Sequence, residues 1–432
     1  MRSRHQGAEN VGVGSSDSPL CVNAERVLRR IEELAGIGAT PEGGVTRLGF
    51  SAADREAQRY LADEARRSGL VVDVDSAGNV LMRRAHGPST GRSVLFGLHL
   101  DTVRNGGRLD GAYGVVGALE VLERLDEAGV ETALKPVAVA FSNEEGALFQ
   151  QPFWGSLSLT GRIDDLPRDP RDLNGLSLRE PLRLAGGDLD ALETAAWPQG
   201  SIAAYLELHI EQGPVLERTG FPIGVVDSIV GRIVIDVDIT GQAGHAGTTP
   251  MPGRRDALVA AGQIVQAAER LAAERQLCRV ATVGRLSLQP GSTNVIPGAV
   301  SLTAELRDGS RSRLVTAERE FRGEAALIGK QTGCEVKAKA SLRVDPEDAD
   351  PRIRDIVATV ASRLGLTHTT TPSGAGHDAQ VMASAAPFGM IFVPSQDGLS
   401  HVPQEYTAPE DLVDGADVLL NSVLALTRGS AA

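Results

Sequence analysis

Histidines and carboxylates follow directly after two strongly apolar segments of this chain. His99 and Asp101 end the first segment, and Glu144 and Glu145 follow the second. Imidazole nitrogens and carboxylate oxygens bind divalent ions, and burying such groups is costly unless their charge is compensated. A cation would compensate it. The four residues therefore indicate a hydrolytic metal site in which one glutamate binds metal and the other activates water.

Three further residues have the types needed to complete such a site: Asp110, His209 and His401. Asp110 lies in the glycine-rich stretch GGRLDG, where the backbone can bring a carboxylate close to an ion. His209 lies in an alternating strand-like run, and His401 in a loop after a late apolar segment. Asp101 stands two residues after His99, on the same side of an extended strand, so its carboxylate could orient the imidazole. Singly, each residue is more typical of a surface or core position. Their placement after buried strands favours a site.

The apolar segments at 93–100 and 136–141 have the composition of strands that are covered on both faces. Helices are predicted for residues 21–34, 51–69 and 114–128, and Ser51 is a suitable N-cap for the second of them. Ligands of open α/β sheets bind at the carboxyl ends of the strands, which is where the polar clusters stand. The sequence thus predicts an α/β fold that gathers these residues at one sheet edge.

A different pattern begins at Gly231, where apolar and polar residues alternate as in a half-buried strand. The predicted elements that follow are a helix at 254–275, strands at 279–288 and 300–306, a helix at 312–332 and a strand at 336–342. This β-α-β-β-α-β order is ferredoxin-like. The α/β pattern then returns with a helix at 352–364, a strand at 389–393 and a helix from Pro409. We therefore expect a disordered leader (1–20), a catalytic domain in two parts (21–230 and 344–432) and an inserted domain (231–343).

The chain has 432 residues, with 42% hydrophobic and 23% charged residues, which is typical of a globular protein of two domains. The net charge of −13 disfavours nucleic acid as a partner. No stretch approaches the roughly 20 apolar residues of a membrane span. The N-terminus lacks the apolar core of a signal peptide, so we expect a cytoplasmic protein without a membrane partner. The three cysteines form no CxxC pair and indicate neither disulfides nor a zinc finger.

Six motifs connect the chain with a known family: GLHLDTVRNGGRLDG, NEEG, ELHIEQGPVLE, GHAGTTPM, GSTNVIPG and SGAGHDA. Their order and spacing resemble the hydantoinase/carbamoylase branch of the M20 metallohydrolases, from about Ala39 to the end. That branch contains N-carbamoyl-L-amino-acid hydrolases, β-ureidopropionases and allantoate amidohydrolases. M20 peptidases usually have Asp where this chain has His209, so the resemblance favours an amidohydrolase. It implies a mixed-sheet dinuclear catalytic domain with an inserted ferredoxin-like α+β lid that also forms a homodimer.

The resemblance also implies a role for each matching residue. One divalent ion would be held by His99, Asp110 and His209, and the other by Asp110, Glu145 and His401. Glu144 would be the general base, with Asp101 behind the ligands. The lid residue His245 would reach the active site of a neighbouring subunit and stabilise the oxyanion. Substrate contacts would come from Gln212, Asn294, Arg307, Gly374, Gly376 and His377.

Some of these positions also have plainer interpretations. Arg307 ends an alternating strand and projects from its polar face, where a guanidinium could bind a carboxylate bidentately or simply face solvent. His245 could be a turn residue, and Asn294 a turn cap. The chain departs from the family pattern at Leu98, often Ser, and at Asn143, often Glu. It is also apolar at Leu148 and Phe149, where Arg is common. None of these departures falls on a predicted metal ligand, but they can affect which substrate side chain the pocket accepts.

The predicted activity is metal-dependent hydrolysis of the carbamoyl C–N bond of N-carbamoyl-L-amino acids, giving the amino acid, ammonia and carbon dioxide. Two ions chosen from Zn²⁺, Mn²⁺, Co²⁺ and Ni²⁺ suit the ligand types. The alternatives are an allantoate amidohydrolase, which residues 153–156 (FWGS) slightly favour, a β-ureidopropionase and an M20 exopeptidase. A non-catalytic ligand-binding protein is a further alternative, which is disfavoured because every ligand position is filled.

Overall fold

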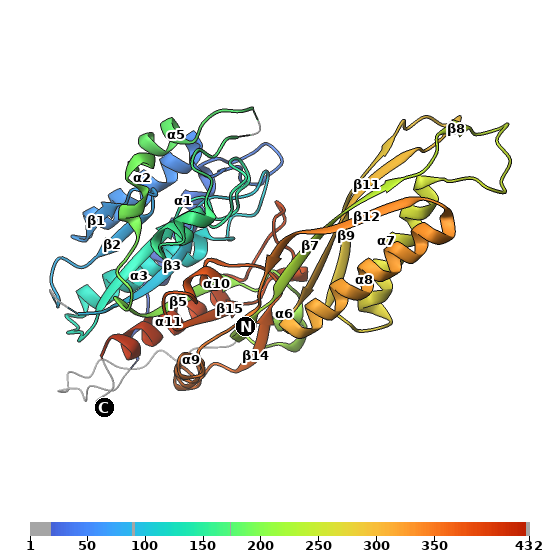
Figure 1. The fold of residues 1–432 in the computed structure, drawn as a ribbon. Coiled ribbons are helices and arrows are strands. Elements are labelled where there is room, and N and C mark those ends of the chain that lie inside the picture. The colour runs from blue at the N-terminus through green and yellow to red at the C-terminus, as the bar shows by residue number, and fades with distance from the viewer. Residues whose placement is uncertain (1–18, 89–90, 173, 429–432) are drawn as a thin grey trace.

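The computed structural model describes residues 19–88, 91–172 and 174–428, and it has two lobes, each built around its own β-sheet (Figure 1). Nearly all of the predicted leader lies outside the described residues. Leu20, at the end of that segment, exchanges two hydrogen bonds with Asn421. The described residues form no helix that is both long and apolar enough to span a bilayer.

The larger lobe contains a nine-stranded mixed sheet, as expected for an α/β fold. Its strands are β1 (Val71–Val74), β2 (Val80–Arg83), β3 (Ser93–His99), β4 (Lys135–Phe141), β5 (Ile202–Ile210), β6 (Ile223–Ile229), β13 (Glu347–Asp348), β14 (His368–Ser373) and β15 (Phe388–Val393). The order is β1-β2-β4-β3-β5-β15-β6-β13, and β14 pairs with β6. The central strands β4, β3, β5 and β15 run parallel, whereas the flanking pairs β2–β4 and β15–β6 are antiparallel.

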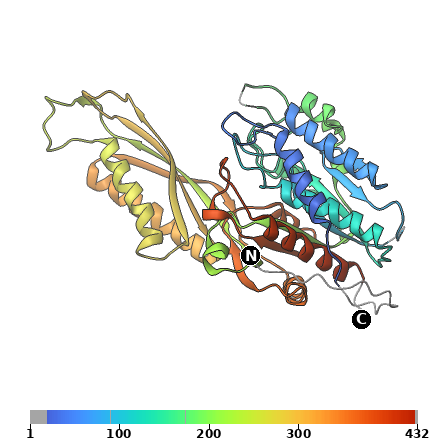
Figure 2. The same cartoon turned by 180° about the vertical axis from the view of Figure 1, so that it is seen from behind.

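Helices cover both faces of this sheet, which explains why all seven residues of β3 are apolar or buried. One face is covered by α1 (Ala24–Gly36), α2 (Ala52–Arg67), α3 (Ala112–Glu127), α9 (Pro351–Arg363) and α11 (Pro409–Thr427). Of these, α1, α3 and α11 pack against one another (Figure 2). The opposite face carries α4 (Trp154–Leu159) and α10 (Asp378–Met382). Val94, Phe96 and Leu98 of β3 point into the first layer, and Leu95 into the second.

The remaining helices of this lobe are short connections: α5 (Arg179–Leu184), α6 (Val215–Thr219), and the 3₁₀ segments η1 (Ile163–Asp165), η2 (Leu189–Ala195) and η3 (Gln396–Gly398). The Ser51 side chain caps α2 by accepting from Asp54 N, as predicted. Helix α1 begins at Ala24, later than predicted, with Asn23 as its N-cap. The reason is that Val22 N is bonded to Asp417 on α11, which holds the preceding residues outside the helix.

The smaller lobe contains an antiparallel four-stranded sheet of order β12-β7-β11-β9. Its elements are β7 (Gly231–Thr240), α7 (Ala257–Ala273), β9 (Val280–Gln289), β11 (Ala299–Asp308), α8 (Arg311–Thr332) and β12 (Glu335–Val344), in the predicted β-α-β-β-α-β order. Both helices cover one face, where the alternating apolar residues of β7 and β11 are buried. A short pair, β8 (Gly244–His245) and β10 (Val295–Ile296), extends the end remote from the larger lobe (Figure 1).

The chain enters the smaller lobe after β6 and returns to the first sheet at β13. Gln380 on α10 donates to Val230 O and Asp345 O, so one side chain holds both connecting segments. Gly231 is packed so closely against Pro346 that a Cβ would approach its ring within 2.6 Å. The two sheets are therefore joined by a tight double connection.

Candidate metal centre

The strand order of the larger sheet brings the predicted metal ligands to one edge. His99 ends β3, Glu144 and Glu145 follow β4, and His209 lies near the end of β5. Since β3 lies between β4 and β5 and the three strands are parallel, their carboxyl ends meet. The side chains of these residues are buried or nearly so, as expected for a site assembled at the edge of a covered sheet.

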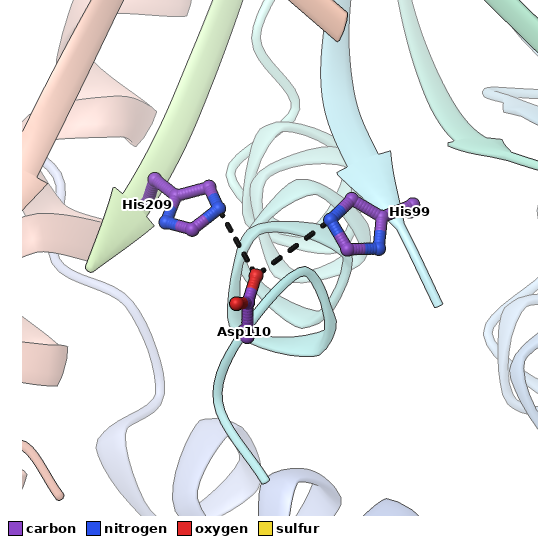
Figure 3. A group of neighbouring side chains, drawn as sticks. All are labelled: His99, Asp110 and His209. Carbon is purple, nitrogen blue, oxygen red and sulfur yellow. Dashed lines mark ion pairs between the residues drawn. The ribbon is translucent and has the colours of Figure 1, made fainter. Parts of the chain in front are cut away.

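Asp110 lies in the middle of the cluster, at the turn before α3. Its Oδ1 faces the Nε2 atoms of His99 and His209, at 3.7 and 3.3 Å (Figure 3). Its Oδ2 lies 3.0 Å from Nε2 of His401. Gly111 has φ of +69°, and a Cβ there would lie 2.5 Å from the His99 ring. The turn therefore needs glycine, and it presents the two oxygens of one carboxylate to two different groups of ligands.

Both buried imidazoles are fixed by backbone carbonyls. Nδ1 of His99 lies 2.9 Å from Asp101 O, and Nδ1 of His209 lies 2.8 Å from Ile210 O. A carbonyl only accepts, so these contacts place a proton on Nδ1 and leave Nε2, the atom that faces Asp110, as the nitrogen available to a metal ion. This is the tautomer in which a histidine binds metal through Nε2.

Asp101 lies behind the ligands, but it contacts them differently from the expectation. Its carboxylate is 3.7 Å from Nδ1 of His99, too far for a hydrogen bond, and its backbone carbonyl orients the ring instead. The carboxylate oxygens accept from the backbone N–H groups of Glu144 and Glu145, at 3.0 and 3.2 Å. Asp101 therefore connects the end of β3 to the two glutamates.

The electrostatics of the cluster favour cation binding. Burial, followed by repulsion from Glu145 and Asp378, raises the pKa of Glu144 well above its usual range. Burial and then Asp110 raise the pKa of Glu145 to about 8. The hydrogen bond with Asp110, opposed by burial, raises the pKa of His401 to about 9. Buried carboxylates that repel one another are stabilised when a divalent ion lies between them.

Ligand atoms of three residues come within 4.8 Å of one another in three combinations among the described residues. These combinations are His99 with Asp110 and His209, Asp110 with Glu145 and His401, and His99 with Glu144 and Glu145. The first two equal the predicted ligand sets, and they share Asp110. Mixed imidazole and carboxylate donors suit Zn²⁺ and neighbouring divalent transition metals. The residues therefore fit divalent ions.

Two of the predicted substrate residues, Gln212 and His377, contact this cluster, and Gly374 and Gly376 lie in the segment just before His377. Gln212 donates from Nε2 to Asp110 Oδ2 at 2.8 Å. His377 is buried behind His209, with ring centroids 4.8 Å apart, and its Nε2 lies 2.7 Å from Ser373 Oγ. It therefore supports a ligand from behind. Gly374 accepts from Arg307 through its carbonyl, and Gly376 packs closely against Phe153.

His245 and Asn294 lie elsewhere. His245 forms β8, and Asn294 immediately precedes β10, at the end of the smaller lobe that is remote from the metal ligands (Figure 1). Both side chains are exposed, and Nδ1 of His245 accepts from the backbone of Gly247 and Thr248. The fold of one chain does not bring these two residues to the cluster.

The positions that depart from the family pattern pack inside the protein. Leu98 is buried between β3 and its helices, and Phe149 stacks edge-on against Phe50. Asn143, with φ of +50°, donates to the carbonyls of Phe149 and Gln151. Trp154 is fully buried and donates to Ala77 O. The segment at 153–156 is therefore anchored in the core by Trp154.

Sequence reasoning missed Glu405, which connects two parts of the site. Its Oε1 accepts from Leu109 N and Asp110 N, at 2.8 and 3.0 Å. Its Oε2 accepts from Ser400 Oγ at 2.8 Å and from His401 N at 3.4 Å. Glu405 thus clamps the Asp110 turn to the His401 loop. No periodic pattern marks a lone glutamate in a loop, so the sequence offered no signal for it.

Arg47 was also missed. Its guanidinium is fully buried and donates to the carbonyls of Leu100, Leu34 and Ile37, at 2.6 to 3.1 Å. The backbone of Arg47 also bonds with Thr102. Arg47 therefore fixes the segment between His99 and Thr102 against the end of α1. Buried arginine is rare without such partners, but the sequence does not reveal the partners.

Comparisons with known proteins identify the family that the chain resembles over most of its length. Residues 95–425 match the model of peptidase family M20/M25/M40. The chain is 40% identical to the N-carbamoyl-L-amino acid amidohydrolase of Geobacillus stearothermophilus, over 94% of this chain and 100% of that protein. It is 34% identical to the allantoate amidohydrolase of Bacillus subtilis, over 92% and 96%. A hydantoinase/carbamoylase family amidase from Burkholderia multivorans superposes with a TM-score of 0.86 at 36% identity, over 95% and 99% of the chains.

Proposed function

Because the chain belongs to peptidase family M20/M25/M40 and is similar over nearly its whole length to N-carbamoyl-L-amino-acid amidohydrolases, we propose that it hydrolyses N-carbamoyl-L-amino acids. The bond broken is the carbamoyl C–N bond, and the products are the amino acid, ammonia and carbon dioxide. The observation that carries the proposal is the placement of Asp110 between two groups of ligands, with Glu144 beside them.

Two divalent ions complete the proposed site, one at His99, Asp110 and His209 and one at Asp110, Glu145 and His401. Bound there, they would polarise the ureido carbonyl and make water more acidic. Glu144 is proposed to take the proton from the attacking water and to deliver it to the leaving nitrogen. Its carboxylate lies 3.6 Å from His99 Nε2, and its backbone is held by Asp101.

The general-base role is tested with Glu144→Gln. The expected result is a loss of turnover of at least about 100-fold, because general-base catalysis contributes on that order, with metal content unchanged. Glu145→Gln is the matched control, since it alters a proposed ligand and should lower metal content. Ammonia release is measured with N-carbamoyl-L-amino acids, N-carbamoyl-β-alanine, allantoate and dipeptides. Full activity of Glu144→Gln would refute the assignment, and turnover of allantoate or dipeptides alone would refute the substrate class.

We also propose that residues 231–343 act as a lid through which two chains form a homodimer. His245 and Asn294 are exposed at the end of the smaller lobe, so they are available to the site of a second chain. Mixing two inactive variants tests this arrangement. In a dimer of Glu144→Gln and His245→Ala chains, one of the two sites has both residues intact. Random exchange should therefore restore about a quarter of the wild-type activity, whereas the absence of any restoration would contradict a shared site.

A further inference from the structure

Two arginines stand directly opposite each other at the base of the smaller sheet. Arg232 on β7 pairs with Arg307 on β11 in the antiparallel register. Both lie on the face opposite α7 and α8, because their neighbours Ile233 and Leu306 are buried in the helix-covered core. Directly opposed side chains of the same charge destabilise a sheet. A nearby anion would remove that repulsion.

The two guanidinium groups differ in the partners that they have. Arg307 donates from Nε to Glu305 Oε1 at 2.6 Å and from Nη1 to Gly374 O at 2.9 Å. Its Nε edge is therefore occupied, and it cannot bind a carboxylate through the Nε–Nη2 fork without losing Glu305. Arg232 is half-buried, and it forms no side-chain hydrogen bond or ion pair with residues 19–88, 91–172 or 174–428. A half-buried guanidinium without a partner is costly.

Arg232 lies close enough to the metal centre for its charge to interact with that of Glu144. Burial lowers the pKa of its guanidinium, and the charges that act on it are those of Glu305, Arg307 and Glu144. The Gly374 carbonyl bonded to Arg307 lies three residues before His377, whose ring packs against His209. The arginine pair is thus connected, through the 374–377 segment, to a residue that packs against the candidate ligand His209.

The arginine pair carries one positive charge more than its directly bonded partner offsets. Arg232 and Arg307 carry two positive charges, and Glu305, which is hydrogen-bonded to Arg307, offsets one of them. We propose that Arg232 is a substrate-binding residue that, together with Arg307, clamps the carboxylate of the ureido acid. This inference rests on the proposed function. In this arrangement the N–H groups of Arg232 are available to bind the carboxylate, whereas Arg307 keeps its hydrogen bonds to Glu305 and Gly374. A clamp of two guanidinium groups makes a free carboxylate a requirement of the substrate class.

The test compares a ureido acid with its uncharged counterpart. Substrates are N-carbamoyl-L-alanine and N-carbamoyl-L-alaninamide, which differ only in the carboxylate. The variants are Arg232→Met and Arg232→Lys. Arg285→Met is the control, because Arg285 is exposed on the same sheet face and bonds to Thr303 and Asp236. Initial rates give kcat and KM. Binding of the acid is also measured by calorimetry in the Glu144→Gln background.

Arg232→Met is expected to raise KM and Kd for the acid by about 10- to 100-fold, the usual worth of a charge-assisted hydrogen bond, with kcat little changed. The amide should be affected far less, and Arg232→Lys should recover part of the loss. The Arg285 variant should behave as wild type. Arg232→Met should melt no lower than wild type, since it removes a like-charge pair.

The following results would overturn the clamp. Equal losses for acid and amide would mean that Arg232 acts on the fold or on Glu144. A fall in kcat at constant KM would place its effect on the chemical step. A loss confined to substrates with an acidic side chain would mean that Arg232 binds a second anion. If the wild-type protein hydrolysed none of the ureido acids, the proposed function would be overturned as well. If the wild-type protein were active and the Arg232 variants had the same KM and Kd, the clamp alone would be overturned.

Discussion

Replacing Glu405 with glutamine changes one atom in the clamp between the Asp110 turn and the His401 loop. The remaining oxygen can still accept from Leu109 N and Asp110 N, which lie 2.8 and 3.0 Å from Oε1. The new amide group faces Ser400 Oγ and His401 N, which both donate to the native Oε2. On the His401 side only, the amide N–H group of the new glutamine therefore faces two other hydrogen-bond donors. The substitution keeps the shape of the side chain while it releases one of the two connected segments.

The magnitude follows from the bonds that are lost. Hydrogen bonds to a charged group are worth about 1.5–3 kcal/mol each, and Ser400 can turn its hydroxyl to accept from the amide. One bond, to His401 N, is then lost outright, and the remaining bonds lose their charge assistance. We expect metal affinity to fall by about 10- to 100-fold, which is typical when a residue that orients a metal ligand is changed. The ligand most affected is His401, whose backbone is released.

Metal affinity is measured by competition with a chromophoric chelator, and unfolding of the metal-free protein is measured in parallel. The matched control is Glu410→Gln, an exposed glutamate in the first turn of α11, where loss of the charge costs about 0.3–1 kcal/mol of stability and no metal affinity. If Glu405→Gln binds metal as tightly as wild type, the clamp does not position His401. If only the stability of the metal-free protein falls, Glu405 acts on the fold and not on the site.

Two further results are expected. Chelation should abolish turnover and lower the melting temperature. Ions that bind only the folded state, at a free concentration of 1,000 times their Kd, add about 4 kcal/mol to the free energy of unfolding. An unchanged melting curve after metal removal would contradict the metal centre. Burial, opposed by hydrogen bonds from Asn79 and Ala77, raises the pKa of Asp75 to about 6. Because the pKa of Asp75 is higher in the folded than in the unfolded protein, its contribution to the free energy of unfolding is greatest at low pH. That contribution falls by up to about 3 kcal/mol as pH rises from about 4 through 6. Asp75→Asn should lack this part of the decline in urea titrations at pH 4 and pH 7, and parallel curves for both proteins would refute it.

The sequence predicts the larger part of the fold because hydrophobic periodicity is local information. Both faces of β3 are buried, so its apolar run identified it, and the alternation of β7 identified a sheet with one open face. The starts of helices α1 and α3 differ from the prediction. Helix α3 begins at Ala112 and not at residue 114, because the preceding turn is shaped by Asp110 and Gly111 in the site. Such a boundary depends on tertiary contacts that no local pattern contains.

The predicted ligands come together because each stands at the end of a strand or in a turn whose position the sheet determines. Glu405 and Arg47 were not predicted, since their partners are 296 and 53 residues away in sequence, at Leu109 and Leu100. The orienting role of Asp101 was assigned to its carboxylate, whereas the carbonyl performs it. Spacing identifies which residues can meet, but not which atom of a residue makes the bond. That choice depends on backbone direction at the strand end.

The two sheets divide the proposed substrate between them. Ligands for the carbamoyl end stand on the nine-stranded sheet, and the arginines for the carboxylate end stand on the four-stranded sheet. The separation between the two ends of a bound ureido acid therefore depends on how the sheets are held together. Gln380 bonds to both connecting segments, at Val230 O and Asp345 O, and lies three residues after His377, which packs against His209. His377 and the helix α10 that follows it thus contact both a proposed metal ligand and the two connections to the lobe that carries the arginines, so the proposed metal binding and carboxylate binding share one structural support.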